Sequence, residues 1–214
     1  MKYIFILLKR IIKYIITLSF KINNFTSFKI KTGLNSYILS TKTNIRGKNN
    51  RLIIGNNVKL NKCNFHINGS NNKIIIHNNT YINNATFWIE DNFNYIIINK
   101  NCSFHGNIQL AACESTYIKI GKECMFSHDI FLRTTDSHAI LYKGKRINQA
   151  KNIQIGNKVW IGMQTIILKG ANIPDGCIIG ARSTITNSIM KSNSIYAGSP
   201  AKLIKDDIFW TKQR

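Results

Sequence analysis

The sequence predicts an all-β fold, because two apolar repeats indicate a parallel β-helix. One helix is expected before this β-helix and a short extension after it. In the C-terminal third, isoleucine recurs every six residues, at Ile155, Ile161, Ile167, Ile173, Ile179 and Ile185. Upstream the spacing is 22 residues, at Ile54, Ile76, Ile98 and Ile120. A period of six fits neither a helix nor an alternating strand, but it fits a short strand followed by a turn. Three such units close one triangular coil around a column of isoleucines.

Small residues and corner residues support this interpretation. Four positions after successive isoleucines stand small or β-branched residues, namely Val159, Thr165, Ala171, Cys177 and Ser183. Glycine and asparagine at the corners accept the positive φ values that tight turns require. The 22-residue spacing is then an 18-residue coil with four extra residues at one corner. In this frame Cys102, Cys124 and Cys177 fill the same small interior position, which favours a structural role.

One loop interrupts the repeat. Ile120 and Ile155 are 35 residues apart, which is one 18-residue coil plus 17 residues, and the excess falls in residues 133–152. This segment is polar and contains Asp136 and His138. Because a long loop on a regular solenoid usually carries function, we expect the active site there.

We expect one domain, since 214 residues with 44% apolar content suffice for a single sizeable core. Residues 31–205 are expected to form the β-helix with the loop 133–152, preceded by a basic amphipathic helix or cap over residues 1–30. Residues 206–214 are expected to be a C-terminal tail.

Basic residues interrupt the apolar N-terminal segment, residues 1–22, so it fits neither a membrane-spanning helix nor a signal peptide. On a helix, one side collects the polar residues Lys2, Lys9, Arg10, Lys13 and Thr17. Two alternatives follow. The helix lies in the headgroup plane of an anionic membrane, or it packs on the protein's own body as a cap.

Charge and cysteine content restrict the partners. A formal net charge of +21 predicts an anionic partner such as phosphate, anionic lipid or acidic polysaccharide. Specific nucleic-acid binding is not expected, because the sequence shows no helix-turn-helix, zinc-finger or RNA-binding motif. The five cysteines are odd in number and form no CxxC pair, which argues against a disulfide framework and a zinc knuckle. A reducing cytoplasm is therefore expected.

Three motifs carry a family resemblance over about residues 50–205. They are Thr135-Asp136-Ser137-His138, Gly156-Asn157-Lys158-Val159-Trp160-Ile161-Gly162 and Ala197-Gly198-Ser199-Pro200-Ala201-Lys202. With these motifs the sequence resembles the hexapeptide-repeat acyltransferases, in particular the sugar and capsule O-acetyltransferase branch that includes polysialic acid O-acetyltransferases. The resemblance implies a left-handed coil, although parallel crossovers are generally right-handed. It also implies acetyl-CoA as acyl donor and a homotrimer with an active site in each groove between subunits.

The resemblance implies that His138 is the base that removes the proton of the acceptor hydroxyl. Histidine suits this role because it titrates near neutral pH. Asp136 is close enough in sequence to orient the imidazole or to stabilise its charged form. Trp160 matches a tryptophan that lines the family's site beside the acceptor, where an indole offers a stacking surface and an N–H donor. The alternative for Trp160 is an aromatic plug at a corner.

For acetyl-CoA the resemblance implies a path along the C-terminal coils. The pantetheine arm is expected to pass Gly162, Gly180 and Ala181. Arg182 and Lys202 are the candidate partners of the phosphates, and each also fits a solvated surface charge.

No metal is expected. His105 and His128 are 23 residues apart, one residue out of register with the coil, and no third histidine completes a zinc site.

The sequence thus predicts an acetyl-CoA-dependent O-acetyltransferase for a hydroxyl of a bacterial capsule, lipopolysaccharide or precursor, in the cytoplasm or at the inner face of the membrane. The positive charge favours an acidic acceptor. Two alternatives stay open: an N-acetyltransferase of an amino sugar nucleotide, and a non-catalytic β-helix that binds glycan without turnover.

Overall fold

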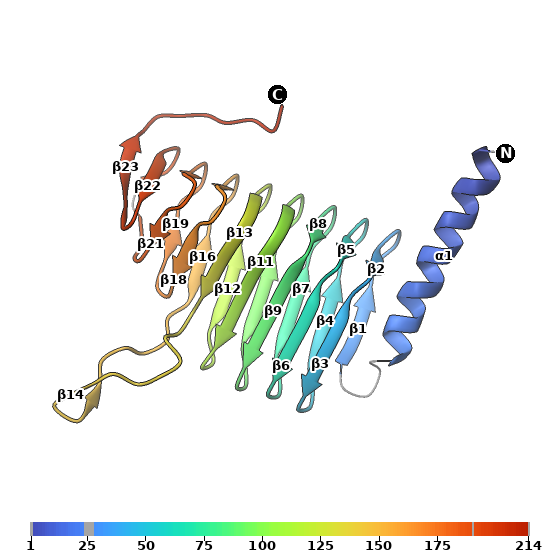
Figure 1. The fold of residues 1–214 in the computed structure, drawn as a ribbon, viewed down its shortest axis with the longest axis horizontal. Coiled ribbons are helices and arrows are strands. Elements are labelled where there is room, and N and C mark those ends of the chain that lie inside the picture. Colours follow the sequence, from blue (N-terminus) through green and yellow to red (C-terminus); the bar gives the residue numbers. More distant parts are fainter. Residues whose placement is uncertain (1, 24–27, 190, 214) are drawn as a thin grey trace.

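The protein is a three-sided parallel β-solenoid with one helix across its N-terminal end (Figure 1). The computed structural model describes residues 2–23, 28–189 and 191–213. Met1 and residues 24–27, which belong to the predicted N-terminal segment, lie outside the described residues. Strand β1 begins at Phe28, inside the segment expected as helix and cap.

Most coils contribute one strand to each of three faces. The first face contains β1 (Phe28–Thr32), β4 (Asn50–Ile54), β7 (Lys73–Ile76), β10 (Tyr95–Ile98), β12 (Tyr117–Ile120), β16 (Ile153–Ile155) and β19 (Asn172–Ile173). The second face contains β2 (Tyr37–Leu39), β5 (Lys59–Asn61), β8 (Tyr81–Asn83), β17 (Trp160–Ile161), β20 (Ile178–Ile179), β22 (Ile195–Gly198) and the antiparallel β23 (Ala201–Lys205). The third face contains β3 (Lys42–Arg46), β6 (Asn64–Asn68), β9 (Ala85–Glu90), β18 (Ile166–Leu168) and β21 (Thr184–Ile185).

Two long strands bend from the second face onto the third. They are β11 (Ser103–Cys113) and β13 (Met125–Arg133). The start of β11 pairs with β8, and its end pairs with β9. Positions near the bend have positive φ, as at Asn107 (48°) and Asp129 (58°). Asparagine and aspartate tolerate this backbone conformation better than most residues.

The predicted repeat is confirmed residue by residue. Ile54, Ile76, Ile98 and Ile120 are Cα partners in successive first-face strands. Ile155 and then Ile173 continue the same column. The four extra residues of the long coils lengthen the third face as well as its corner: β9 has six residues, whereas β18 has three.

The interior is filled by stacked side chains from equivalent positions. The isoleucine column is buried, and the Phe104 and Phe126 rings stack with centroids 4.5 Å apart. All five cysteines are free and buried, and the Cys102 and Cys124 thiols each donate to a main-chain carbonyl at 3.1 Å. The predicted interior position of Cys102, Cys124 and Cys177 is confirmed.

A buried asparagine ladder closes the corner between the third and first faces. The Asn72 N–H donates to Asn50 Oδ1 at 3.1 Å, and the Asn94 N–H donates to Asn72 Oδ1 at 2.8 Å. Asn72 Nδ2 also donates to the Asp91 carbonyl at 2.9 Å. Because buried polar groups are costly without partners, this ladder stabilises the wide corner that the extra residues create.

Helix α1 (Lys2–Asn23) packs on the first coil through what we call its coil-facing side, Lys13, Thr17 and Phe20. The Ile38 N–H donates to Thr17 Oγ1 at 3.0 Å, and Lys13 Nζ lies 5.3 Å from the centre of the Tyr37 ring. No helix among the described residues is long and apolar enough to cross a bilayer.

The segment after β23 runs back across the coils, as Figure 1 shows. Trp210 Nε1 donates to the Lys158 carbonyl at 2.8 Å, and Lys212 Nζ donates to the Asn101 carbonyl at 3.1 Å. The C-terminal segment therefore covers corners of coils that precede it by more than 50 residues.

Candidate active site

The long loop leaves the third face at the end of β13 and returns at β16, which agrees with the predicted excursion. Its tip is a small hairpin, β14 (Leu141–Tyr142) and β15 (Lys145–Arg146), that projects away from the solenoid (Figure 1). Its base folds back onto the third face, where His138 lies.

An ion pair ties the loop to the preceding coil. Arg146 donates from Nη1 and Nη2 to the two carboxylate oxygens of Glu114, at 2.6 and 3.0 Å. Thr135 Oγ1 donates to the same carboxylate. The hydrogen bond from Arg146 is the main reason that the pKa of Glu114 lies below its ordinary value. Bidentate guanidinium–carboxylate pairs have a defined geometry, so this contact orients the loop as well as holding it.

Asn148 is the centre of the loop. Its side chain is 8% exposed and makes four hydrogen bonds. Oδ1 accepts from the Ile140 N–H at 2.7 Å, and Nδ2 donates to the His138 carbonyl at 2.8 Å. Asn148 therefore holds the main chain on both sides of residue 139.

The hydrogen bond between Asp136 and His138 joins main-chain atoms. The His138 N–H donates to the Asp136 carbonyl at 2.8 Å. The Asp136 carboxylate instead accepts from Lys169 Nζ and from Asn148 Nδ2, the latter at 2.9 Å. Lys169 is the main cause of the lowered pKa of Asp136. In this arrangement Asp136 anchors the loop; orientation of the imidazole by its carboxylate stays a prediction.

His138 is exposed and borders a groove of about 500 Å³ on the third face. The groove is lined by Trp88, Glu90, Gln109, Arg133, Ser137 and His138. One face of the Trp88 indole is covered by the His66 ring, with centroids 3.9 Å apart and planes 15° apart. Larger hollows of about 590 and 680 Å³ flank α1, and none of the predicted site residues lines them.

Trp160 lies outside this groove. It is in β17 on the second face and is 37% exposed, and its ring is 6.0 Å from the ring of Trp210 in the C-terminal segment. Among the described residues, no hydrogen bond or ring contact joins Trp160 to His138. Within one chain the two predicted catalytic side chains are therefore on different faces of the solenoid.

The predicted acetyl-CoA residues come together at the corner between the second and third faces. The Gly162 N–H donates to the Ile179 carbonyl at 2.8 Å, and Gly180 follows Ile179 in the next coil. A Cβ on Gly162 would lie 2.6 Å from the Ala181 nitrogen, and one on Gly180 would lie 2.8 Å from the Ala197 Cβ. Close packing of the coils therefore requires both glycines, whatever else binds there.

The two predicted phosphate partners flank that corner. Arg182 is exposed, with φ of 57°, and follows Ala181 directly. Lys202 is exposed in β23, where it is the Cα partner of Ala197. Both charges therefore lie next to the corner that Gly162, Gly180 and Ala181 form.

His105 and His128 form a pair at the same corner further upstream. The His105 and His128 rings are 6.4 Å apart, and burial together with the charge of His128 lowers the pKa of His105. Over residues 2–23, 28–189 and 191–213, no three His, Cys, Asp or Glu side chains are arranged to hold a metal ion.

Comparison with known proteins agrees with this fold. Residues 152–187 match the family model described as bacterial transferase hexapeptide (six repeats). The solved structure of the polysialic acid O-acetyltransferase OatWY superposes with a TM-score of 0.82 at 32% identity, over 88% of this chain and 92% of that one. The chain belongs to the hexapeptide-repeat acyltransferase family, whose coil is left-handed. Within it, the similarity to polysialic acid O-acetyltransferases covers nearly the whole chain.

Curated relatives match over shorter segments. A polysialic acid O-acetyltransferase of Neisseria meningitidis is 34% identical over 84 residues, which are 38% of this chain and 39% of that protein. A chloramphenicol acetyltransferase of Morganella morganii is 46% identical over 57 residues, 27% of each protein. The chain thus spans between about a quarter and two fifths of the length of these relatives.

Sequence reasoning missed the residues that hold the loop and the wall of its groove. Glu114, Asn148 and Lys169 are distant in sequence from the residues that they bind. In the sequence alone, none of them differs from an ordinary polar surface residue. Trp88 had one available signal: it stands one 22-residue coil after His66, so the repeat predicts that the two rings stack.

Proposed function

We propose that this protein transfers an acetyl group from acetyl-CoA to a hydroxyl of an acidic cell-surface sugar, with His138 as the general base. The observation that carries the proposal is the exposed imidazole of His138 at the edge of a 500 Å³ groove, on a loop held by the Glu114–Arg146 pair and by Asn148. A base must be held within hydrogen-bond reach of the proton that it removes. The anchored loop supports that role.

The reaction requires one proton acceptor and no further cofactor. The acceptor oxygen attacks the thioester carbonyl carbon while the imidazole takes the hydroxyl proton. The carbonyl electron pair moves onto oxygen, and the oxyanion needs nearby N–H donors. Collapse then breaks the carbon–sulfur bond, and the departing thiolate takes the proton from the imidazolium. The products are an acetyl ester and free CoA.

The groove has features suited to a sugar ring. Trp88 and Arg133 both line the groove, and the fully buried Ala111 lies between them in the strand register. An indole face and a guanidinium at one groove suit a sugar ring and its carboxylate. Arg133 donates to the loop from Nε and Nη2, and a guanidinium has further N–H groups for a carboxylate.

The wider charge pattern and the relatives support an acidic acceptor. Glu90 also lines the groove, and we assign it to accepting hydrogen bonds from sugar hydroxyls. The net charge of +21 attracts anionic polymers. Two of the relatives reported above are named for polysialic acid, an acidic polymer, which supports a sialic acid or similar acidic sugar here.

For acetyl-CoA, we propose the corner row of Gly162, Gly180 and Ala181, with Arg182 and Lys202 as phosphate partners. Gly162 and Gly180 add no side chain at this corner, which leaves main chain for an extended arm to follow. The two exposed cations at the end of the row supply charge for phosphates.

We further propose that the active protein is a homotrimer in which Trp160 of one subunit completes the groove beside His138 of its neighbour. The separation of these two residues within one chain supports a shared site. Light scattering is expected to give about three times the chain mass of 24.5 kDa. Co-assembly of His138→Ala and Trp160→Ala chains is expected to restore activity that each variant lacks. Lack of restoration in mixed trimers would contradict the shared site.

The test of function uses the full chain with acetyl-CoA and three acceptors: a sialic acid oligosaccharide, a neutral maltooligosaccharide and an amino sugar nucleotide. Free CoA is measured with a thiol reagent, and the product by mass spectrometry. We expect an acetyl ester on the acidic sugar. Replacing His138 by Ala is expected to lower kcat about 10²- to 10⁴-fold, and His77→Ala serves as a histidine control outside the groove.

Three outcomes would contradict the proposal. Unchanged turnover in the His138→Ala variant would remove the base assignment. Acetylation of the amine alone would favour the N-acetyltransferase alternative. Glycan binding without any CoA release from the wild type would favour the non-catalytic alternative.

A further inference from the structure

The N-terminal helix turns its apolar side away from the protein. Its coil-facing side consists of Lys13, Thr17 and Phe20, which lie together at 100° per residue. The opposite side carries Leu8, Ile12 and Ile15, which are 51%, 53% and 57% exposed. A helix on a globular protein normally buries its apolar side, whereas here the described part of the chain leaves that side uncovered.

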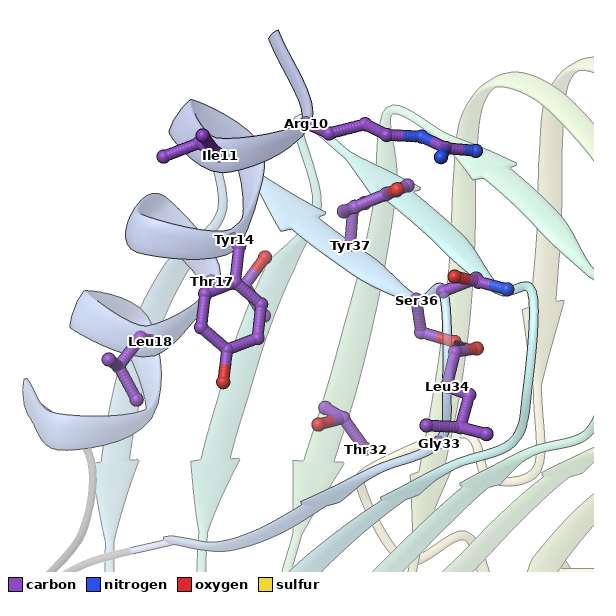
Figure 2. Close-up of a pocket in the computed structure, with 11 residues that line it drawn as sticks. Arg10, Ile11, Tyr14, Thr17, Leu18, Thr32, Gly33, Leu34, Ser36 and Tyr37 are labelled. Carbon is purple, nitrogen blue, oxygen red and sulfur yellow. Dashed lines mark hydrogen bonds between the residues drawn. The ribbon is translucent and has the colours of Figure 1, made fainter. Parts of the chain in front are cut away.

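The exposed apolar surface is continuous along the helix. It is centred on Leu8, Ile12 and Ile15, and Leu7, Ile11, Ile16 and Leu18 flank these three residues. An exposed apolar patch of this extent typically marks a protein or membrane interface. We call it the outer face of α1, and in Figure 2 Ile11 projects on this side, whereas Arg10 extends over the coil.

The charge around the outer face selects the kind of partner. All nine acidic residues of the chain lie from Glu90 onward, whereas 14 of the 30 basic residues precede it. The helix and the first coils are therefore uniformly basic. Two copies joined through their outer faces would bring two such basic ends together, which like-charge repulsion disfavours. An anionic lipid surface has the opposite charge.

A basic hollow runs beside the helix. It has a volume of about 680 Å³, and its lining includes Lys9, Arg10, Lys13 and Lys59. The hollow lies between the helix and the first coils, so its four cations raise the positive potential behind the helix and attract an anionic surface, while the apolar residues of the outer face enter the acyl boundary.

We propose that the outer face of α1 docks on the anionic inner surface of a membrane, and that the basic residues behind the helix attract the protein to that surface. The helix lies in the interface plane and does not cross it. The solenoid then stands on the membrane by its first coil, and the His138 loop, several coils away, stays in the aqueous phase. This location would bring the enzyme to glycans that are assembled at the membrane.

The experiment measures sedimentation of the full chain with vesicles of phosphatidylglycerol and phosphatidylcholine, and with phosphatidylcholine vesicles alone. We expect binding to the anionic vesicles that weakens as salt rises. The triple variant Leu8→Ser, Ile12→Ser and Ile15→Ser is expected to bind roughly 100-fold more weakly. The matched control is Ile204→Ser, which alters a residue 64% exposed at the other end of the solenoid.

Circular dichroism melting and transfer to a soluble acceptor check that the triple variant is folded, and we expect both to equal the wild type. Equal binding of the triple variant and the wild type to anionic vesicles would overturn the proposal. So would absence of wild-type binding, or a change of oligomeric state in the triple variant, because the latter would show that the outer face joins copies of the chain. Each outcome is independent of whether the acetyl acceptor is the proposed sugar.

Discussion

Replacing Asn148 by Ala is expected to uncouple the His138 loop while the solenoid stays intact. The variant loses the bonds from Asn148 to the Ile140 N–H and the His138 carbonyl, which hold the main chain around the imidazole. At about 1 kcal/mol net for each of these two bonds, the ordered loop loses ~2 kcal/mol. Since 1.36 kcal/mol corresponds to tenfold, kcat is expected to fall about 30-fold.

The assay separates positioning from folding. We expect KM for acetyl-CoA to change little, because Asn148 does not belong to the Gly162 corner row, and the melting temperature to change little, because no coil depends on the loop. The control is Gln149→Ala, which removes an exposed neighbour and is expected to leave kcat within about twofold.

A wild-type kcat in the Asn148→Ala variant would contradict the positioning role of Asn148. A loss of activity that matched a loss of folded protein would also contradict it, because Asn148 would then act on the solenoid and not on the loop.

Three further predictions concern the loop, the thiols and the corner ladder. The pKa values of Glu114 and Asp136 are lowered in the folded protein, so their ion pairs stabilise the loop fully above the ordinary pKa values of 4.5 and 3.8, and this stabilisation is lost as pH falls below them. Hydrogen exchange of the loop should therefore show full protection at pH 6. Loss of protection already at pH 6 would contradict the ion pairs. Burial raises the pKa of the Cys63 and Cys113 thiols to about 11. A thiol reagent should therefore react with the cysteines only after denaturation, and fast labelling of the native protein would show that the core is open. Asn72→Ala leaves the Asn94 N–H and the Asp91 carbonyl without partners, which should cost about 2–4 kcal/mol in urea unfolding, whereas Asn71→Ala, at the half-buried neighbouring position, should cost less.

The repeat, the coil and the place of the loop were predictable because each is a local property. The spacing of the isoleucines specifies which residues face inward, and the register of the strands agrees with it at every coil from Ile54 to Ile173. The break in that spacing located the loop that carries His138.

The contacts that make the loop a site were not predictable in the same way. Arg146 binds Glu114 across 32 residues, and Lys169 binds Asp136 across 33. No periodic pattern links these pairs, because the loop does not follow the repeat. Proximity of Asp136 to His138 in sequence suggested a carboxylate–imidazole contact, whereas Lys169 and Asn148 occupy that carboxylate.

The sequence by itself determined that the chain coils, where the coil opens, and that the N-terminal helix has one basic and one apolar side. Only the tertiary structure decided that the basic side of the helix faces the coil, that Trp160 and His138 lie on different faces, and that Trp88 borders the His138 groove. The physical reason is range: a repeat encodes contacts between equivalent positions one coil apart, whereas the direction of a helix face and the closure of a loop depend on surfaces that exist only after the coils have stacked.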